Sequence, residues 1–367
     1  MPKISQILQL LDQKFPFSRA EKWDKTGLLI GDLDAQISRV CVCYEITDAV
    51  LDGAPDAELF LAYHPLIFRP LENLHFSNPT ARLSARILAA RQNLICLHTA
   101  LDGAPLGRAL GDELARQIGM QNVRIHGASG TEKLVKIVTF ALHENVENVC
   151  DAMWSAGAGH IGLYKNASFR SHGIGTFLPT QGANPAIGKV GELERVEETK
   201  IEVVAPQNAW KSVVAAMKGA HPYEEVAYDV LALENAEINQ SYGPLRLGEI
   251  APISLDNFAR EIGEKLGAPG VRLVRSGIET AKIVACSPGS GASFIEKLPR
   301  GTVFVSGDFK HHDALLAQNR GVALVDVSHA ATETATLKLL REALSGCDVQ
   351  IETSHEPLNP FENLKNP

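Results

Sequence analysis

Imidazole and carboxylate side chains recur where the apolar, strand-like runs of this sequence end. His64 follows the run ELFLAY, and His98 follows NLICL, with Asp102 four residues later. The runs GTVFVS and GVALVDV lead into Asp308 and His329. The full set at these four strand ends is His64, His98, Asp102, Asp308, His311, His312, His329 and Glu333. Imidazole and carboxylate together suit zinc, iron, manganese or nickel, whereas thiolate-rich sets suit structural zinc.

The positions of these residues give them a reason to meet. In open α/β sheets, ligands bind outside the carboxyl ends of the strands. Taken singly, each has a plainer explanation, since a lone histidine at a strand end is more often a hydrogen-bonded core or rim residue, and Asp308 after Gly307 suits a turn. Four strand ends with the same ligand types favour a shared cation. If a helix begins near Ser328, His329 and Glu333 lie one turn apart on one face. A carboxylate that bridges two cations is then a route to a dinuclear hydrolytic centre.

Strands and helices alternate on either side of a central segment, and these elements must position the set. Residues 1–126 and 246–367 contain short strands that are apolar on both faces, separated by amphipathic helices. Such strands indicate a parallel or mixed sheet that is covered on both sides. The predicted fold class is therefore α/β, a mixed-sheet core with helices on both faces.

The central segment, residues 127–245, has a different pattern. It predicts strand, helix and strand twice, first from KLVKIVTFAL onward and then from TKIEVVAP onward. Two such halves in one unit are typical of a ferredoxin-like domain. The core is thus expected to be interrupted by an α+β insert domain.

Composition excludes several classes of protein. Among 367 residues, 43 Asp and Glu outnumber 35 Lys and Arg, for a net charge of −8. A chain this acidic repels phosphate backbones, so nucleic acid is not an expected partner. The sequence contains no run of 18 or more apolar residues, so no membrane-spanning helix is expected. The first residues form an amphipathic helix without a signal-peptide cleavage site, so we expect a cytoplasmic protein whose six cysteines are reduced.

Five short motifs, in order along nearly the whole chain, resemble those of one family. This is the GTP cyclohydrolase 1 type 2 family, also called the NGG-interacting-factor-like proteins. The matching segments are Trp23-Asp24 with Gly27-Leu28, His64-Pro65-Leu66-Ile67-Phe68, His98-Thr99 with Asp102, Gly307-Asp308 with Lys310 and His312, and Ser328-His329 with Glu333. His221-Pro222-Tyr223 resembles the end of a PII/CutA-like domain, as in the longer bacterial members.

The resemblance implies a two-metal centre in each subunit of a toroidal homohexamer. His64, Asp102 and Glu333 would hold one cation. His329 and Glu333 would hold the second, together with a histidine whose position is taken here by Tyr63. A phenol is a poor neutral-pH ligand for a divalent ion, though ferric iron binds phenolate. The second cation could therefore be weak, absent or ferric, or His98 or His312 could replace the missing ligand.

Two functions follow as hypotheses. The first is a hydrolase that uses one or two zinc, iron or manganese ions against a nucleotide or related heterocycle, with ring opening of GTP as the implied activity. In it, His98 or His312 would transfer protons as catalytic acid or base. The alternative is a non-enzymatic metal-binding scaffold, or a small-ligand sensor that uses the PII/CutA-like insert, because a family label does not settle chemistry.

Overall fold

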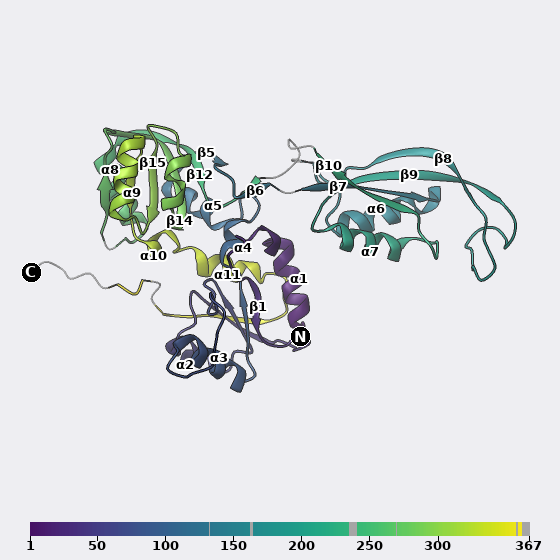
Figure 1. Ribbon diagram of the computed structural model, residues 1–367, viewed down its shortest axis with the longest axis horizontal. Coiled ribbons are helices and arrows are strands. Elements are labelled where there is room, and N and C mark those ends of the chain that lie inside the picture. The colour runs from purple at the N-terminus through teal and green to yellow at the C-terminus, as the bar shows by residue number, and fades with distance from the viewer. Residues whose placement is uncertain (132, 162–163, 235–240, 269, 357–358, 362–367) are drawn as a thin grey trace, which may run out of the picture. The chain divides into compact units, whose positions relative to one another are not determined.

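The computed structural model describes residues 1–131, 133–161, 164–234, 241–268, 270–356 and 359–361. The chain divides into two compact units (Figure 1). Unit 1 comprises Met1–Gly130 with Tyr242–Pro367, and unit 2 comprises Thr131–Ser241. No helix in the described part of the chain is long and apolar enough to cross a membrane.

The first sheet of unit 1 has five strands in the order β1-β4-β3-β2-β17. Their bounds are β1 (Gly27–Ile30), β2 (Arg39–Cys43), β3 (Leu59–Ala62), β4 (Asn93–Cys96) and β17 (Gln350–Thr353). The strands β17, β2, β3 and β4 run parallel, and β1 is antiparallel to β4. The carboxyl ends of β2, β3 and β4 therefore share one edge of the sheet.

Helices cover both faces of this sheet, as the apolar strands predict. Alternate residues of a strand point to opposite faces. Val40 and Val42 pack with α1 (Ile4–Lys14) and α11 (Thr336–Ala343). Cys41 and Cys43 pack with α2 (Asp48–Gly53) and α3 (Pro79–Ala89) on the other face. All six cysteines are free thiols.

The second sheet of unit 1 has six strands in the order β13-β16-β15-β14-β12-β5. Their bounds are β5 (Gln121–Ile125), β12 (Arg246–Ser254), β13 (Arg272–Val274), β14 (Thr280–Ser290), β15 (Val303–Gly307) and β16 (Ala323–Asp326). The three strands β14, β15 and β16 are parallel, and the outer pairings are antiparallel. Helices α5 (Leu110–Ile118) and α8 (Leu255–Lys265) pack on one face. The helix α9 (His311–Arg320) and the 3-10 helix η3 (Ala292–Lys297) pack on the other.

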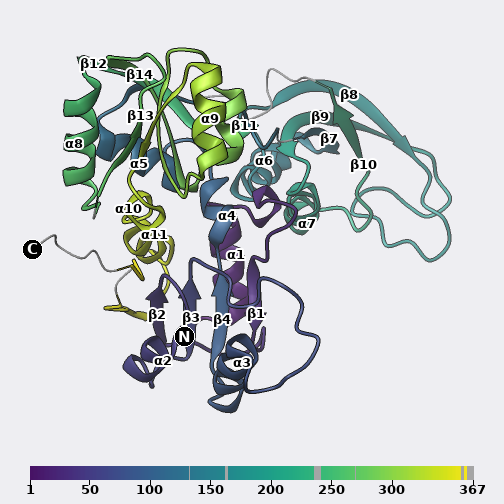
Figure 2. The ribbon, with the colours of Figure 1, turned by 60° about the vertical axis from the view of Figure 1, so that its left-hand side comes forward.

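Unit 1 therefore contains two sheets rather than one continuous core sheet. Strand β5 leaves the first part of the chain to join the second sheet, and β17 returns from the C-terminal part to the first. Figures 1 and 2 both show α10 (His329–Thr332) and α11 between these sheets. Apolar periodicity predicts which residues are buried in strands, but it does not say which strands pair.

Unit 2 contains one four-stranded antiparallel sheet with two helices. Along the chain the elements are β7 (Leu134–Ala141), α6 (Val146–Ser155), β8 (Phe169–Phe177), β9 (Glu194–Pro206), α7 (Trp210–Ala220) and β10 (Tyr228–Leu233). The strand order is β10-β7-β9-β8, and every pairing is antiparallel. Apolar residues of α6 and α7, such as Val149 and Val213, pack on the sheet. The observed element order is strand, helix and strand, twice.

Short elements complete the described chain. They are η1 (Phe17–Arg19), α4 (His98–Asp102), β6 (Gly130–Thr131), η2 (His143–Asn145) and β11 (Ser241–Tyr242).

Candidate metal centre

The strand ends of both sheets in unit 1 line one cavity of about 490 Å³. Tyr63 and His98 come from the ends of β3 and β4 in the first sheet, and His329 follows β16 in the second. The last four residues of β14, 287–290, also line it. The rule that ligands gather at carboxyl ends of parallel strands thus applies to two sheets at once.

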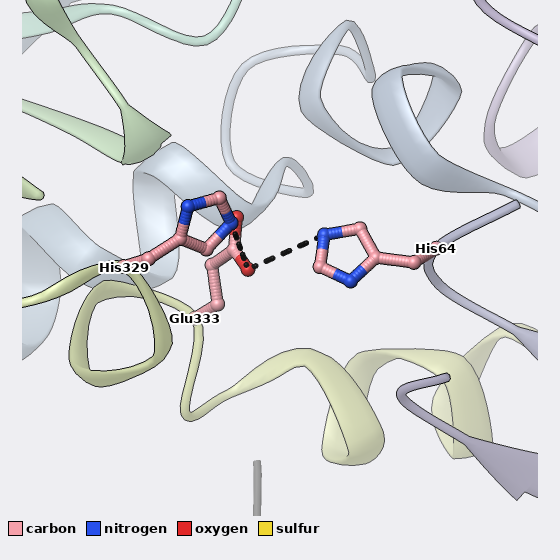
Figure 3. Close-up of side chains that lie close together, drawn as sticks. All are labelled: His64, His329 and Glu333. Carbon is pink, nitrogen blue, oxygen red and sulfur yellow. Dashed lines mark ion pairs between the residues drawn. The ribbon is translucent and has the colours of Figure 1, made fainter. Parts of the chain in front are cut away.

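Three of the residues singled out in the sequence form a potential cation site. His64, His329 and Glu333 each offer one ligand atom, and these atoms lie within 4.8 Å of one another. Glu333 Oε2 is 3.2 Å from His329 Nε2 and 3.8 Å from His64 Nε2. Figure 3 shows the two imidazoles approaching the Glu333 carboxylate from either side. His329 begins α10 and Glu333 follows its last residue, so the helical spacing expected from the sequence brings them together.

A carboxylate orients each imidazole of this triad. His64 Nδ1 lies 3.0 Å from Glu45 Oε1, and His329 Nδ1 lies 2.7 Å from Asp308 Oδ2. Metal-binding histidines usually donate their second ring N–H to a carboxylate or carbonyl, which fixes the tautomer and leaves the other nitrogen free to ligate. Both Nε2 atoms face Glu333 in this arrangement.

His98 has the same kind of support without belonging to the triad. Its Nδ1 is 2.8 Å from Asp24 Oδ1, and the other oxygen of Asp24 accepts from the backbone N–H of Thr99 at 3.0 Å. The His98 ring lies edge-on to His64, with 5.2 Å between centroids. His98 therefore lines the cavity as an oriented imidazole beside the triad.

Asp102 joins the triad through Tyr63. The Tyr63 hydroxyl lies 3.3 Å from both carboxylate oxygens of Asp102 and 3.3 Å from Glu333 Oε1. The Tyr44 hydroxyl donates to Glu333 Oε2. The side chains of Tyr63, Asp102 and Glu333 are all buried. A phenol has one proton to donate, so it satisfies one of three surrounding carboxylate oxygens.

Burial and like charge perturb the acid groups of the cavity. Burial, followed by the charge of Glu333, raises the pKa of Asp102 to about 8. Burial lowers the pKa of His329, but the hydrogen bonds and charges of Glu333 and Asp308 outweigh it and raise that pKa to about 9. Burial and the charges of Asp102 and Glu333 also hold the pKa of Tyr63 well above its ordinary value. Buried carboxylates crowded in this way are stabilised by a cation.

Not every residue singled out in the sequence reaches this cavity. His312 lies in the first turn of α9 with its ring against that of His311, at 5.5 Å between centroids. Neither is among the described residues that line the cavity, whereas His98 is. Of the two histidines expected to transfer protons, the structure brings one to the triad.

The backbone is strained at three positions around the centre. His98, Asp308 and Ser328 have positive φ angles of 29°, 60° and 77°. With its ψ of 156°, Ser328 lies in a backbone region that glycine favours. Non-glycine residues held in such conformations cluster at functional sites.

Sequence reasoning missed three supporting residues, namely Asp24, Tyr44 and Glu45. Tyr44 and Glu45 directly follow β2, so the rule that found His64 applied equally to them. Asp24 belongs to the first of the five motifs, but no local pattern in the sequence indicates that it is the partner of a histidine. The neighbouring Trp23 is 55% exposed and lines the cavity.

The donor set fits a divalent cation. Two imidazole nitrogens and a carboxylate, with a second carboxylate nearby, are ligands that zinc, iron and manganese accept. They would hold the ion next to open cavity space, as a catalytic rather than a closed structural site requires.

Comparisons with known proteins agree on one family. The family model described as Duf34/NIF3 (NGG1p interacting factor 3) matches residues 2–360. A Bacillus subtilis protein named "GTP cyclohydrolase 1 type 2 homolog" is 36% identical over 366 residues, covering 97% of each chain. A Mycobacterium tuberculosis protein of the same name is 36% identical over 338 residues, covering 90% of this chain and 88% of its own.

Two solved structures are similar to this chain over its full length. The crystal structure of a Bacillus cereus protein related to NIF3 superposes with a TM-score of 0.84 at 32% identity, covering 99% of both chains. A Staphylococcus aureus protein, SA1388, covers 99% of both chains with a TM-score of 0.69 at 28% identity. The mixed α/β architecture is thus shared over the full length.

Proposed function

Because the chain belongs to the Duf34/NIF3 (NGG1p interacting factor 3) family, we propose that it is a divalent-metal-dependent hydrolase acting on a nucleotide or related heterocycle. The observation that carries the proposal is the triad of His64, His329 and Glu333, two of which, His329 and Glu333, line an open cavity. The name of the relatives suggests GTP as the first substrate to test.

Each residue has a defined part in this proposal. His64, His329 and Glu333 hold the cation, and Asp102 completes the negative charge around it. A bound divalent ion supplies Lewis acidity and lowers the pKa of a water molecule. His98 accepts a proton at Nε2 and returns it to the leaving nitrogen, while Asp24 fixes its tautomer. His312, in the first turn of α9, is not among the described residues that line the cavity, so the proposal assigns it no proton transfer.

Metal content and product formation test the proposal together. The purified protein is incubated with zinc, manganese or ferrous iron, and bound metal per chain is measured by elemental analysis. Each loaded sample then receives GTP, and formate release is followed. We expect at least one equivalent of metal and turnover that His98→Gln abolishes while metal content stays unchanged. Absence of turnover with every metal would refute the cyclohydrolase activity but not the metal site.

A specific observation favours a second candidate, a non-catalytic metal-binding scaffold or sensor. Tyr63 occupies the position of a second-cation ligand and contacts Asp102 and Glu333 instead. Two-metal hydrolysis needs both ions. In Tyr63→His, a second metal equivalent without hydrolysis would support the scaffold. A large gain in hydrolysis would instead identify a weakened enzyme.

We further propose that unit 2, within the predicted limits 127–245, is a ferredoxin-like domain of the PII/CutA type. Its support is the order β7-α6-β8-β9-α7-β10 with sheet order β10-β7-β9-β8. From the family resemblance we also propose that six chains assemble into a toroidal homohexamer. Light scattering coupled to gel filtration tests this assembly, with the mass of six chains expected and that of one chain contradicting it.

A further inference from the structure

We propose that Lys297 is the anion-binding residue of the cavity, so that the ligand is a small organic anion with a planar ring. This inference rests on the proposed function. In that function the reacting end of the ligand meets the cation, and Lys297 would bind the opposite, anionic end of the same ligand. Lys297 lines the same cavity as His329 and Glu333.

One continuous segment of chain connects the cation site to Lys297. A Cβ atom on Gly289 would lie 2.6 Å from Glu333 Oε1 and 3.2 Å from His329 Nε2, so the C-terminal end of β14 lies directly against the triad. Gly289 N–H donates to Thr332 Oγ1 at 2.8 Å, and the Ser306 hydroxyl donates to the Gly289 carbonyl at 3.1 Å. This end of the strand is therefore fixed on both sides.

After β14 the chain enters η3, which ends at Lys297. A 3-10 helix rises about 2 Å per residue, so η3 is roughly 10 Å long. Ser290, Ser293, Phe294 and Lys297 all line the cavity. The wall thus carries hydroxyl groups along its length and an ammonium group at its end.

The Lys297 ammonium is available to a ligand. Its Nζ lies 3.3 Å from the Gly127 carbonyl and 5.3 Å from the centroid of the Phe294 ring. Among described residues it makes no ion pair, although Glu21 also lines the cavity. In a chain with a net charge of −8, an uncompensated cation on the cavity wall favours an anionic ligand.

Trp23 supplies a surface for a planar ring. It is 55% exposed, and its ring lies 5.7 Å from Phe68 and 6.0 Å from His98 between centroids. Aromatic faces bind planar rings by stacking. A cavity of about 490 Å³ is within the range that small-molecule ligands fill.

Binding of guanosine 5′-monophosphate and of guanosine separates the anion from the ring. Titration calorimetry on the zinc-loaded protein measures both affinities, and intrinsic fluorescence reports contact with Trp23. We expect the phosphate to strengthen binding by roughly tenfold to hundredfold, as charged hydrogen bonds do. Lys297→Met should remove this preference, and Lys297→Arg should retain most of it. Trp23→Phe should weaken both ligands and abolish the fluorescence change.

Lys282 provides the matched control, because it is an exposed lysine on β14 that is not among the cavity-lining residues. Lys282→Met should bind both ligands as the unchanged protein does. Equal affinities for the two ligands, or a phosphate preference that survives in Lys297→Met, would overturn the assignment. If the unmodified protein prefers guanosine 5′-monophosphate to guanosine but does not hydrolyse GTP, the result counts against the proposed function alone. Metal content and the thermal midpoint of each variant verify that it is folded.

Discussion

Metal binding to this site should depend steeply on pH. Asp102, with a pKa raised to about 8, and His329, with a pKa raised to about 9, both carry a proton at neutral pH in the metal-free protein. A cation requires an ionised carboxylate and a neutral imidazole, so each binding event displaces two protons below pH 8. The apparent affinity should therefore rise about fiftyfold from pH 7 to pH 8, and about tenfold from pH 8 to pH 9.

Competition between the protein and a chromophoric chelator of known affinity measures this slope with zinc. Calorimetry in two buffers of different ionisation enthalpy counts the displaced protons directly. Asp102→Asn is the matched variant, because its amide has about the same size and carries no titratable proton. Its slope between pH 7 and pH 8 should fall to about tenfold per pH unit. An affinity that does not change over this range in the unmodified protein would refute the reasoning.

Three further outcomes follow from the same centre. Without metal, the free energy of unfolding should fall as pH rises from 6 to 9, because the folded protein retains protons on Asp102 and His329 that the unfolded chain has released. Urea denaturation at each pH measures this fall, and a saturating metal should abolish it. Asp308→Asn should weaken metal binding about tenfold to a hundredfold, because it removes the carboxylate that orients His329, and chelator competition checks it. Ser328→Gly should stabilise the protein by about 1 kcal/mol in urea denaturation, since relief of a φ of 77° exceeds the loss of the Ser328 cap on Ala331.

The sequence indicated the residues of the candidate cation site better than it indicated the sheets. His64 and His329 could be found because each lies within three residues of the end of a buried strand, and parallel strands direct their carboxyl ends to one edge. Glu333 could be found because helical spacing fixes its distance from His329. These are local rules, and each needs only a few neighbouring residues.

The remaining parts depended on contacts distant in sequence. Periodicity could not show that β5 and β17 exchange between two sheets, because strand pairing is set by the whole fold. Nor could it place His312, since the first turn of a helix can present a side chain in several directions. The partnership of Asp24 with His98 joins a loop to a strand end 74 positions away, and no local pattern encodes it.

The exchange of β5 and β17 has a consequence for biosynthesis. Strand β17 completes the first sheet only after the ribosome has made residues 350–353, and Glu333 emerges shortly before them. His64 and Asp102 must therefore wait, in a partly assembled sheet, for partners that are made more than 200 residues later. Contacts this remote in sequence slow folding, because the intervening chain must be closed before they form. Cation capture is thus expected to be a terminal event of maturation rather than a nucleus for it.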